Sequence, residues 1–235
     1  MKIRGATVFV TGANRGIGLA FAKEAVSMGA AKVYAGMRKT QGFSVPGIVP
    51  VPIDVTNAES VRRAAAQCGD VSIVVNNAGI GALVSDALDE RVEAVARDMM
   101  EVNLYGIIRV TQAFAPILAG KPESAIINVL SDVSWRAAPV LTSYAASKAA
   151  AWSFTNNARI ALKAQNTAVV GVHVGFVDTD LTAGFDVPKM DPSDVARKAY
   201  RVLEAGGSEV LADEGSVKLK ASLSAARPEY IYPEG

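Results

Sequence analysis

The chain has 235 residues, with 24 Lys and Arg, 23 Asp and Glu and one His, so its net charge is +1. Hydrophobic residues make up 50% of the chain and charged residues 20%, a composition typical of a globular protein with its own core. These numbers exclude the strongly basic balance of many nucleic-acid-binding proteins. A single Cys and a single His leave too few ligands for an intrachain disulfide or a common zinc site. We therefore expect no nucleic-acid partner and no metal.

Short β-rich segments alternate with longer helical segments along the chain. Strands are expected at residues 6–10, 32–35, 48–53, 71–75, 125–130 and 168–174, with a short edge strand at 210–212. Helices are expected at 16–28, 57–67, 143–163 and 192–204, and residues 88–119 are expected to form two helices with a bend. The main strands are apolar on both faces, as parallel strands covered by helices are. The pattern predicts one α/β domain over residues 1–235, a Rossmann-type doubly wound parallel sheet with helices on both faces.

A glycine-rich segment follows the first predicted strand, where the next helix begins. It contains Gly12, Asn14, Arg15, Gly16, Ile17 and Gly18. Glycines let the backbone approach a pyrophosphate closely, and a helix N-terminus offers free N–H groups and the positive end of its dipole. Glycine spacing alone would fit a tight turn without a ligand equally well. The position in the first crossover of a doubly wound sheet favours a dinucleotide site.

The residues after the second predicted strand indicate which dinucleotide would bind. A carboxylate there would hydrogen-bond the ribose 2′-OH of NAD, but this chain has Arg38 instead. A guanidinium suits a 2′-phosphate, and Arg15 could approach the same phosphate from the other side. The sequence therefore predicts NADP(H). The alternative is that both arginines are solvated surface charges.

Three residues form a candidate catalytic set. Tyr144 and Lys148 are four residues apart at the start of a predicted helix and so project from one face. A nearby ammonium would lower the tyrosine pKa, which makes Tyr144 a candidate general acid for a carbonyl oxygen. Ser131, after the fifth strand, could hydrogen-bond the same oxygen. A Tyr-Lys pair alone is more often an exposed helical pair, but the order of glycine loop, Ser and Tyr/Lys is less easily accidental.

The chain resembles the short-chain dehydrogenase/reductase family over nearly its whole length. The motifs that carry the resemblance are TGANRGIG at 11–18, Asp54-Val55, Asn76-Asn77-Ala78-Gly79, Asn103 within EVNLYG, Ser131, and YAASK at 144–148. The resemblance implies that Tyr144 is the catalytic acid/base and that Lys148 lowers its pKa and holds the nicotinamide ribose. Ser131 would orient the substrate oxygen, and Asn103 would hold a water that links Lys148 to solvent.

The resemblance also implies cofactor contacts. Asp54 and Val55 would flank the adenine, and Arg15 and Arg38 stand where basic residues accompany NADP preference. The run from Asn76 through Asn77 and Ala78 to Gly79 would support the sheet and line the cofactor cleft. After the sixth strand, Val177 and Thr179 would contact the cofactor, and Val174 stands where the family often has proline.

The surroundings of the substrate are less determined by sequence. Val133, Trp135 and Phe176 are expected around the pocket together with the surface loop at 179–191, although Trp135 could equally belong to the core. His173, in an apolar strand, is interpreted as a core histidine with its hydrogen bonds satisfied. Cys68 is interpreted as an inert thiol.

Together these features predict an NADPH-dependent oxidoreductase that transfers hydride between nicotinamide and a small-molecule carbonyl or secondary alcohol. The alternative is a non-catalytic NADP(H)-binding sensor or interaction protein of the same fold. The start of the chain lacks a signal-peptide pattern, and no stretch reaches the ~18 uninterrupted apolar residues of a membrane span. We expect no membrane contact, a cytoplasmic location, and a homodimer or homotetramer, because the interval between Ser131 and Tyr144 lacks the inserted helix that accompanies monomers in the family.

Overall fold

All seven strands lie parallel in one sheet, in the order β3-β2-β1-β4-β5-β6-β7. This computed structural model describes residues 1–232. The strands are β1 (Thr7–Thr11), β2 (Lys32–Met37), β3 (Ile48–Pro52), β4 (Ile73–Asn76), β5 (Ser124–Val129), β6 (Thr167–His173) and β7 (Glu209–Leu211). The predicted doubly wound parallel sheet is confirmed, with strand limits that differ by one or two residues from those expected.

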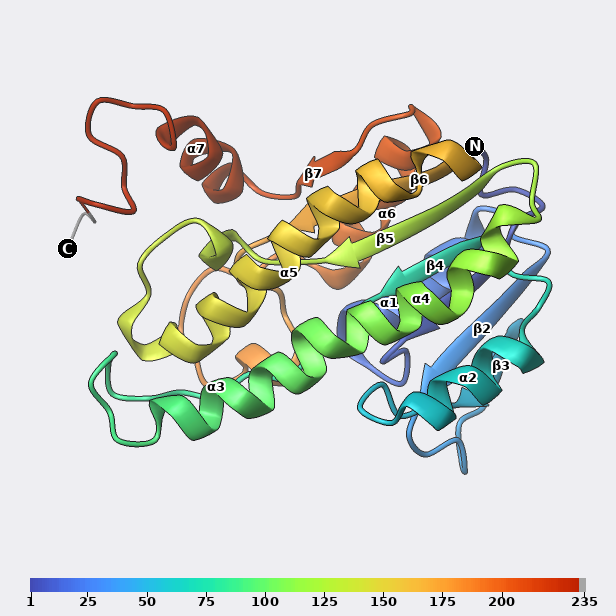
Figure 1. Ribbon diagram of the computed structural model, residues 1–235, viewed down its shortest axis with the longest axis horizontal. Coiled ribbons are helices and arrows are strands. Elements are labelled where there is room, and N and C mark those ends of the chain that lie inside the picture. Colours follow the sequence, from blue (N-terminus) through green and yellow to red (C-terminus); the bar gives the residue numbers. More distant parts are fainter. Residues whose placement is uncertain (233–235) are drawn as a thin grey trace.

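Helices cover both faces of the sheet (Figure 1). They are α1 (Gly16–Ser27), α2 (Ala58–Gln67), α3 (Val92–Met100), α4 (Gly106–Ala119), α5 (Thr142–Ala161), α6 (Pro192–Glu204) and α7 (Glu214–Ser222). On one face, α1 and α6 pack together, and Phe21 meets Tyr200 edge to face with ring centroids 5.3 Å apart. On the other, α2 and α4 cover a layer in which Phe9 and Phe114 lie 4.8 Å apart. Two core layers explain why the strands are apolar on both faces.

Residues 88–119 differ from the expected pair of bent helices. The helix begins at Val92 and runs without interruption to Ala119. Its middle turn, Glu101–Tyr105, is a π-helix, which widens the helix by one residue without breaking it. By length and composition alone this 28-residue helix could cross a membrane, but its apolar side packs on the sheet and on neighbouring helices.

Helix α7 was not expected from the sequence. Only Ser216 and Leu219 of its residues are buried, so it has no apolar periodicity to reveal it. Its start is defined by Asp213, whose carboxylate accepts a hydrogen bond from the N–H of Ser216 at 2.7 Å. This N-cap is the sequence signal that could have located the helix.

Candidate active site

The topological switch point of the sheet lies between β1 and β4: β2 and β3 are added on one side of β1, and β4 to β7 on the other. β1 and β4 are adjacent parallel strands, so their carboxyl ends lie at the same edge of the sheet. Ligands of doubly wound sheets bind at such a position. Here the Thr11 hydroxyl accepts hydrogen bonds from the N–H groups of Asn77 and Ala78, both at 3.0 Å. The Asn77 amide donates in turn to the Thr11 carbonyl at 3.0 Å. These bonds fix the glycine loop against the segment after β4.

Two glycines of the glycine loop pack so closely against neighbouring backbone that a side chain would not fit there. Gly12 has a φ of +66°, and a Cβ there would lie 2.9 Å from the Ala78 Cα. A Cβ at Gly18 would lie 2.3 Å from the Gly12 carbonyl oxygen. Arg15, at the N-cap of α1, provides no side-chain cap, so the first N–H groups of the helix have no such partner within residues 1–232. This cradle of small residues and free N–H groups fits the pyrophosphate of a dinucleotide.

The two arginines expected at a 2′-phosphate have different surroundings. Arg38 is exposed directly after β2. Arg15 forms an exposed ion pair with Asp180, 2.8 Å from Nη1 to Oδ2. The loop that carries Asp180 also reaches the glycine loop at Thr179, whose Cγ2 lies 3.2 Å from a Cβ built at Gly16. Thr179 is therefore at the cleft, while Val177 is buried beneath it in a bridge to Met190.

Asp54 and Val55 are held rigidly after β3. The Asp54 carboxylate accepts hydrogen bonds from the Thr56 hydroxyl at 2.7 Å and the Thr56 N–H at 3.0 Å. These bonds lower the pKa of Asp54, and the charge of Arg38 lowers it further. Val55 is buried against α4, where a Cβ at Gly106 would lie 2.9 Å from its Cγ2. Their role at the adenine remains a prediction.

Asn76 is a structural residue within the predicted cofactor run. Its side chain is buried and donates to the Asn128 amide oxygen at 2.9 Å. Asn128 donates to the Thr155 hydroxyl at 2.9 Å, so the chain of bonds joins β4, β5 and α5. Asn76 thus supports the sheet, while Asn77, Ala78 and Gly79 continue along the edge of the cleft.

Ser131 and Tyr144 line one cavity beyond the carboxyl end of β5. The Ser131 side chain is close enough to the Tyr144 hydroxyl to lower its pKa. One helical turn further along α5, the Lys148 ammonium donates to the Val129 carbonyl at 2.9 Å and lies 5.6 Å from the centre of the Tyr144 ring. The structure therefore brings together three of the four residues predicted to be catalytic: Ser131, Tyr144 and Lys148.

Asn103 lies in the π-helical turn and connects it to α5. Its amide nitrogen donates to the Ser147 hydroxyl and to the Ile80 carbonyl, both at 3.0 Å, and its oxygen accepts from the Ile80 N–H at 2.9 Å. A Cβ at Gly79 would lie 3.2 Å from the Asn103 amide oxygen and 3.9 Å from the Lys148 nitrogen. Asn103 and Lys148 are thus close neighbours, and the water between them remains a prediction.

The pKa of Tyr144 shifts in the direction opposite to the expected one. Burial raises it, the negative charge of Asp132 raises it further, and only the nearby Ser131 side chain lowers it. Burial also lowers the pKa of Lys148 to about 8. The expected lowering by Lys148 is absent from these causes, since its ammonium donates to the Val129 carbonyl instead of the phenol. The Tyr144 phenol is consequently protonated at neutral pH.

The cavity has a volume of about 220 Å³ and is mostly apolar. Val133 and Phe176 line it, as expected. Trp135 does not: a tight turn at Asp132–Ser134 directs the indole into the protein, where it is buried and stacks on His173. The predicted loop at 179–191 also lines the cavity, through residues that include Leu181 and Phe185. Sequence reasoning missed lining residues from other segments, among them Leu83, Asp132, Arg136 and Leu141.

A sequence model described as short chain dehydrogenase matches residues 6–188 of this chain. The chain belongs to this family. It is thus an oxidoreductase of a family that uses nicotinamide cofactors, and the resemblance inferred from its motifs is confirmed.

Three proteins illustrate how similar this short-chain dehydrogenase is to known relatives in sequence identity and in the share of each chain covered. An uncharacterised oxidoreductase of Staphylococcus aureus strain MW2 is 33% identical over 207 residues, 83% of this chain and 89% of that protein. The 11-beta-hydroxysteroid dehydrogenase A of Sesamum indicum is 32% identical over 197 residues, 77% of this chain but only 55% of that protein. The crystal structure of a short chain dehydrogenase from Burkholderia cenocepacia J2315 in complex with NADP is 37% identical, with a TM-score of 0.91 over 97% of this chain and 96% of that one. Other similar structures hold NAD or NADH.

His173 lies directly behind Ser131 in the dehydrogenase. Its Nδ1 is 3.1 Å from the Ser131 carbonyl oxygen, which can only accept, so Nδ1 carries the proton. Its Nε2 is buried without a hydrogen-bond partner among the described residues. The core position expected for His173 is correct, but its hydrogen bonds are only half satisfied.

His173 makes stability depend on pH. Burial lowers the pKa of His173 to about 4, from an ordinary value of 6.5. Between these two pH values the unfolded chain binds a proton that the native state does not, so stability falls as the pH falls. We expect wild type to lose about 3 kcal/mol more stability than His173→Asn between pH 7 and pH 4. Urea denaturation at both pH values measures this, and identical losses in the two proteins would contradict it.

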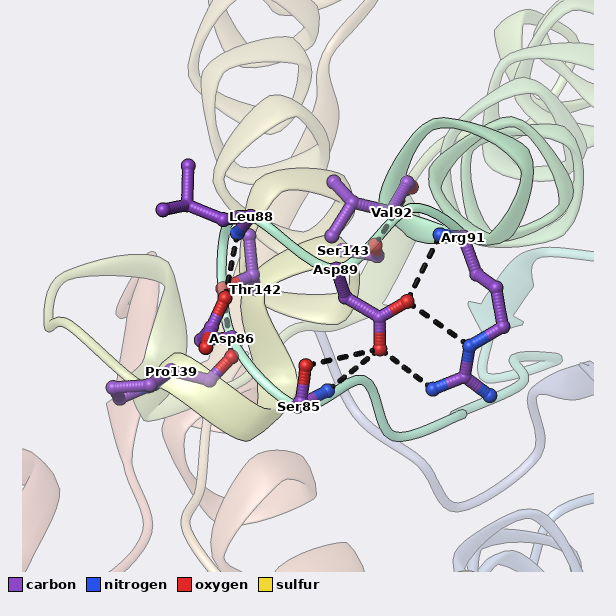
Figure 2. A network of polar contacts seen from close by, with 9 residues as sticks. All are labelled: Ser85, Asp86, Leu88, Asp89, Arg91, Val92, Pro139, Thr142 and Ser143. Atoms are coloured by element: carbon purple, nitrogen blue, oxygen red, sulfur yellow. Dashed lines mark hydrogen bonds and ion pairs between the residues drawn. The ribbon is translucent and has the colours of Figure 1, made fainter.

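The segment between β4 and α3 is anchored beside the start of α5 (Figure 2). The Asp89 carboxylate accepts hydrogen bonds from the N–H and hydroxyl of Ser85 and pairs with the Arg91 guanidinium at 2.6 Å. The Arg91 guanidinium and these bonds hold the pKa of Asp89 far below its usual range. Ser143 of α5 donates to the Val92 carbonyl at 3.0 Å. The residue next to Tyr144 is thereby fixed to the beginning of α3.

Proposed function

We propose that this short-chain dehydrogenase is an NADPH-dependent carbonyl reductase that also catalyses the reverse oxidation of a secondary alcohol. The observation that carries the proposal is the convergence of Ser131 and Tyr144 on one apolar cavity at the sheet edge that also bears the glycine cradle. Lys148 lies within the same group.

Ser131 and Tyr144 would have separate roles in the reaction. When bound, the reduced nicotinamide supplies a hydride to the carbonyl carbon of the substrate. Ser131 would hydrogen-bond the carbonyl oxygen, and the Tyr144 hydroxyl would give that oxygen its proton, so that hydride and proton together form the alcohol. The Tyr144 phenol holds its proton at neutral pH, as the proton donor in the reduction must.

The experiment that tests the proposal is NADPH oxidation with a panel of ketones, aldehydes and diketones. We expect turnover of at least part of this panel. The alternative, a sensor of the same fold, predicts tight NADPH binding without oxidation and no change on substitution of Tyr144.

The preference for NADP over NAD rests on Arg38. A guanidinium directly after β2 can pair with the 2′-phosphate, a charged contact that is absent from NAD. We expect Arg38→Ala to weaken NADPH binding about 10-fold to 100-fold, the usual range for losing a hydrogen-bonded charge pair. Titration with both cofactors measures this, with NADH as the internal control. Unchanged NADPH affinity, or an equal loss for NADH, would show that Arg38 does not read the phosphate.

The homodimer or homotetramer and the cytoplasmic location expected from the sequence remain predictions. Exposed apolar side chains on the outer helices support self-association, with Tyr105 47% exposed beside α4 and Ile160 76% exposed on α5.

A further inference from the structure

One charged pair interrupts the apolar lining of the substrate cavity. Six of the lining residues are large and hydrophobic: Leu83, Val133, Leu141, Phe176, Leu181 and Phe185. Asp132 and Arg136 are the only charged residues that line it within residues 1–232. A charged side chain in apolar surroundings loses hydration, so placing this ion pair in the cavity costs desolvation free energy. An ion pair at the protein surface would not have that cost.

Arg136 is within the reach of a small molecule whose oxygen lies at the catalytic residues. Its Nε donates to one oxygen of Asp132 at 3.1 Å, and the other oxygen of the same carboxylate accepts from the Ser131 hydroxyl at 3.1 Å. Two hydrogen bonds and one carboxylate therefore separate Ser131 Oγ from Arg136 Nε, a distance of at most about 8 Å. A substrate with a carbonyl at Ser131 would need only a few more bonds to reach the guanidinium.

Most of the hydrogen-bonding capacity of Arg136 is unused. A guanidinium has five N–H donors, and only the one on Nε has a partner among the described residues. Its side chain is 28% exposed, whereas Asp132 is 13% exposed and has a partner on each oxygen. The accessible member of the pair is thus the cation, and its two terminal nitrogens have the geometry that grips a carboxylate.

The side of Arg136 on which an anion would bind is determined by the other charges. Arg136 also lines a second hollow of about 490 Å³, with Leu88, Pro139 and Thr142. That hollow carries Asp86, beside the network around Asp89. Asp86 has no ion-pair partner among the described residues and would repel an anion, whereas the Asp132 charge in the first cavity is paired with Arg136, so the first cavity is the more favourable side.

We propose that Arg136 determines substrate specificity, and that the substrate is a carbonyl compound with an apolar body and an anionic group, such as a carboxylate, a few bonds from the carbonyl. This inference rests on the proposed carbonyl reductase activity. Arg136 binds the anionic group bidentately through its terminal nitrogens, and Asp132 fixes the plane of the guanidinium through Nε.

The test uses matched pairs of substrates with NADPH. Levulinate and its longer methyl-ketone homologues are each compared with their methyl esters, and kcat/KM is measured for both members of a pair. The acid-to-ester ratio isolates the anion, because any effect of Arg136 on Asp132 and hence on Tyr144 acts on both substrates. The variants are Arg136→Gln, Arg136→Lys, and the control Arg62→Gln, an exposed arginine paired with Glu59 on α2.

We expect wild type and Arg62→Gln to prefer at least one acid over its ester by about ten-fold or more, in line with a hydrogen bond to a charged group. Arg136→Gln should bring that ratio to near one, mainly through the KM of the acid, and Arg136→Lys should retain part of it. Reduction of esters or neutral ketones without any preference for acids, or an unchanged ratio in Arg136→Gln, would overturn the inference while leaving the carbonyl reductase intact. Failure to reduce any carbonyl compound would overturn the proposed function and this inference with it.

Discussion

Replacing Tyr144 with phenylalanine is expected to lower kcat by about 1000-fold, within the range contributed by a general acid. The change removes one hydroxyl from a cavity shared with Ser131 and leaves the glycine cradle untouched. NADPH affinity should therefore remain within about two-fold of wild type. Steady-state kinetics on a substrate from the carbonyl panel and a separate NADPH titration measure the two quantities.

The control for this variant is Tyr34→Phe. The Tyr34 hydroxyl bonds to Asp70 at 2.9 Å, before the start of β4 and so at the opposite edge of the sheet. Its loss should leave kcat unchanged. Full activity of Tyr144→Phe would show that the phenol transfers no proton, and the enzymatic interpretation would then fail.

Gly18→Ala is expected to be the most damaging change of a single methyl group. The new Cβ would lie 2.3 Å from the Gly12 carbonyl oxygen and 2.4 Å from the Asn77 amide nitrogen, so the loop or the segment after β4 must move. We expect the free energy of unfolding to fall by about 3 kcal/mol, the upper part of the range for overpacking. NADPH binding should weaken in parallel, because the same loop forms the cradle.

Gly69→Ala provides the matched control. Nothing lies within 4 Å of a Cβ at Gly69, and its backbone does not have a positive φ. Denaturant unfolding and NADPH titration of both variants should separate the close contact from a general effect of alanine. Equal stability of the two variants would show that the glycine loop accommodates the added methyl group without strain.

The sheet could be predicted because its signal is simple. Strand segments such as Ile73–Val75 are continuously apolar, and this pattern survives errors of a residue or two at the ends. The π-helical turn around Asn103 could not be predicted in the same way. It changes the hydrogen-bonding partner of the backbone by one residue, and side-chain pattern carries no record of that shift.

The candidate site was predictable where it depends on spacing along one element and not where it depends on burial. A spacing of four residues from Tyr144 to Lys148 suffices to place both on one face of α5. The direction of the Tyr144 pKa depends instead on burial and on Asp132, which only the folded structure supplies. Trp135 illustrates the same limit, since a three-residue turn decides whether it meets the substrate or His173.

The strand order has a consequence for the chain while it is being made on the ribosome. β1 lies in the interior of the sheet, but its second neighbour, β4, is synthesised only after β2, β3 and α2. Until residue 76 has emerged, one side of β1 offers unpaired backbone groups to any other extended chain. Nascent molecules are therefore open to mispairing at β1 in this interval, which ends when β4 pairs with it.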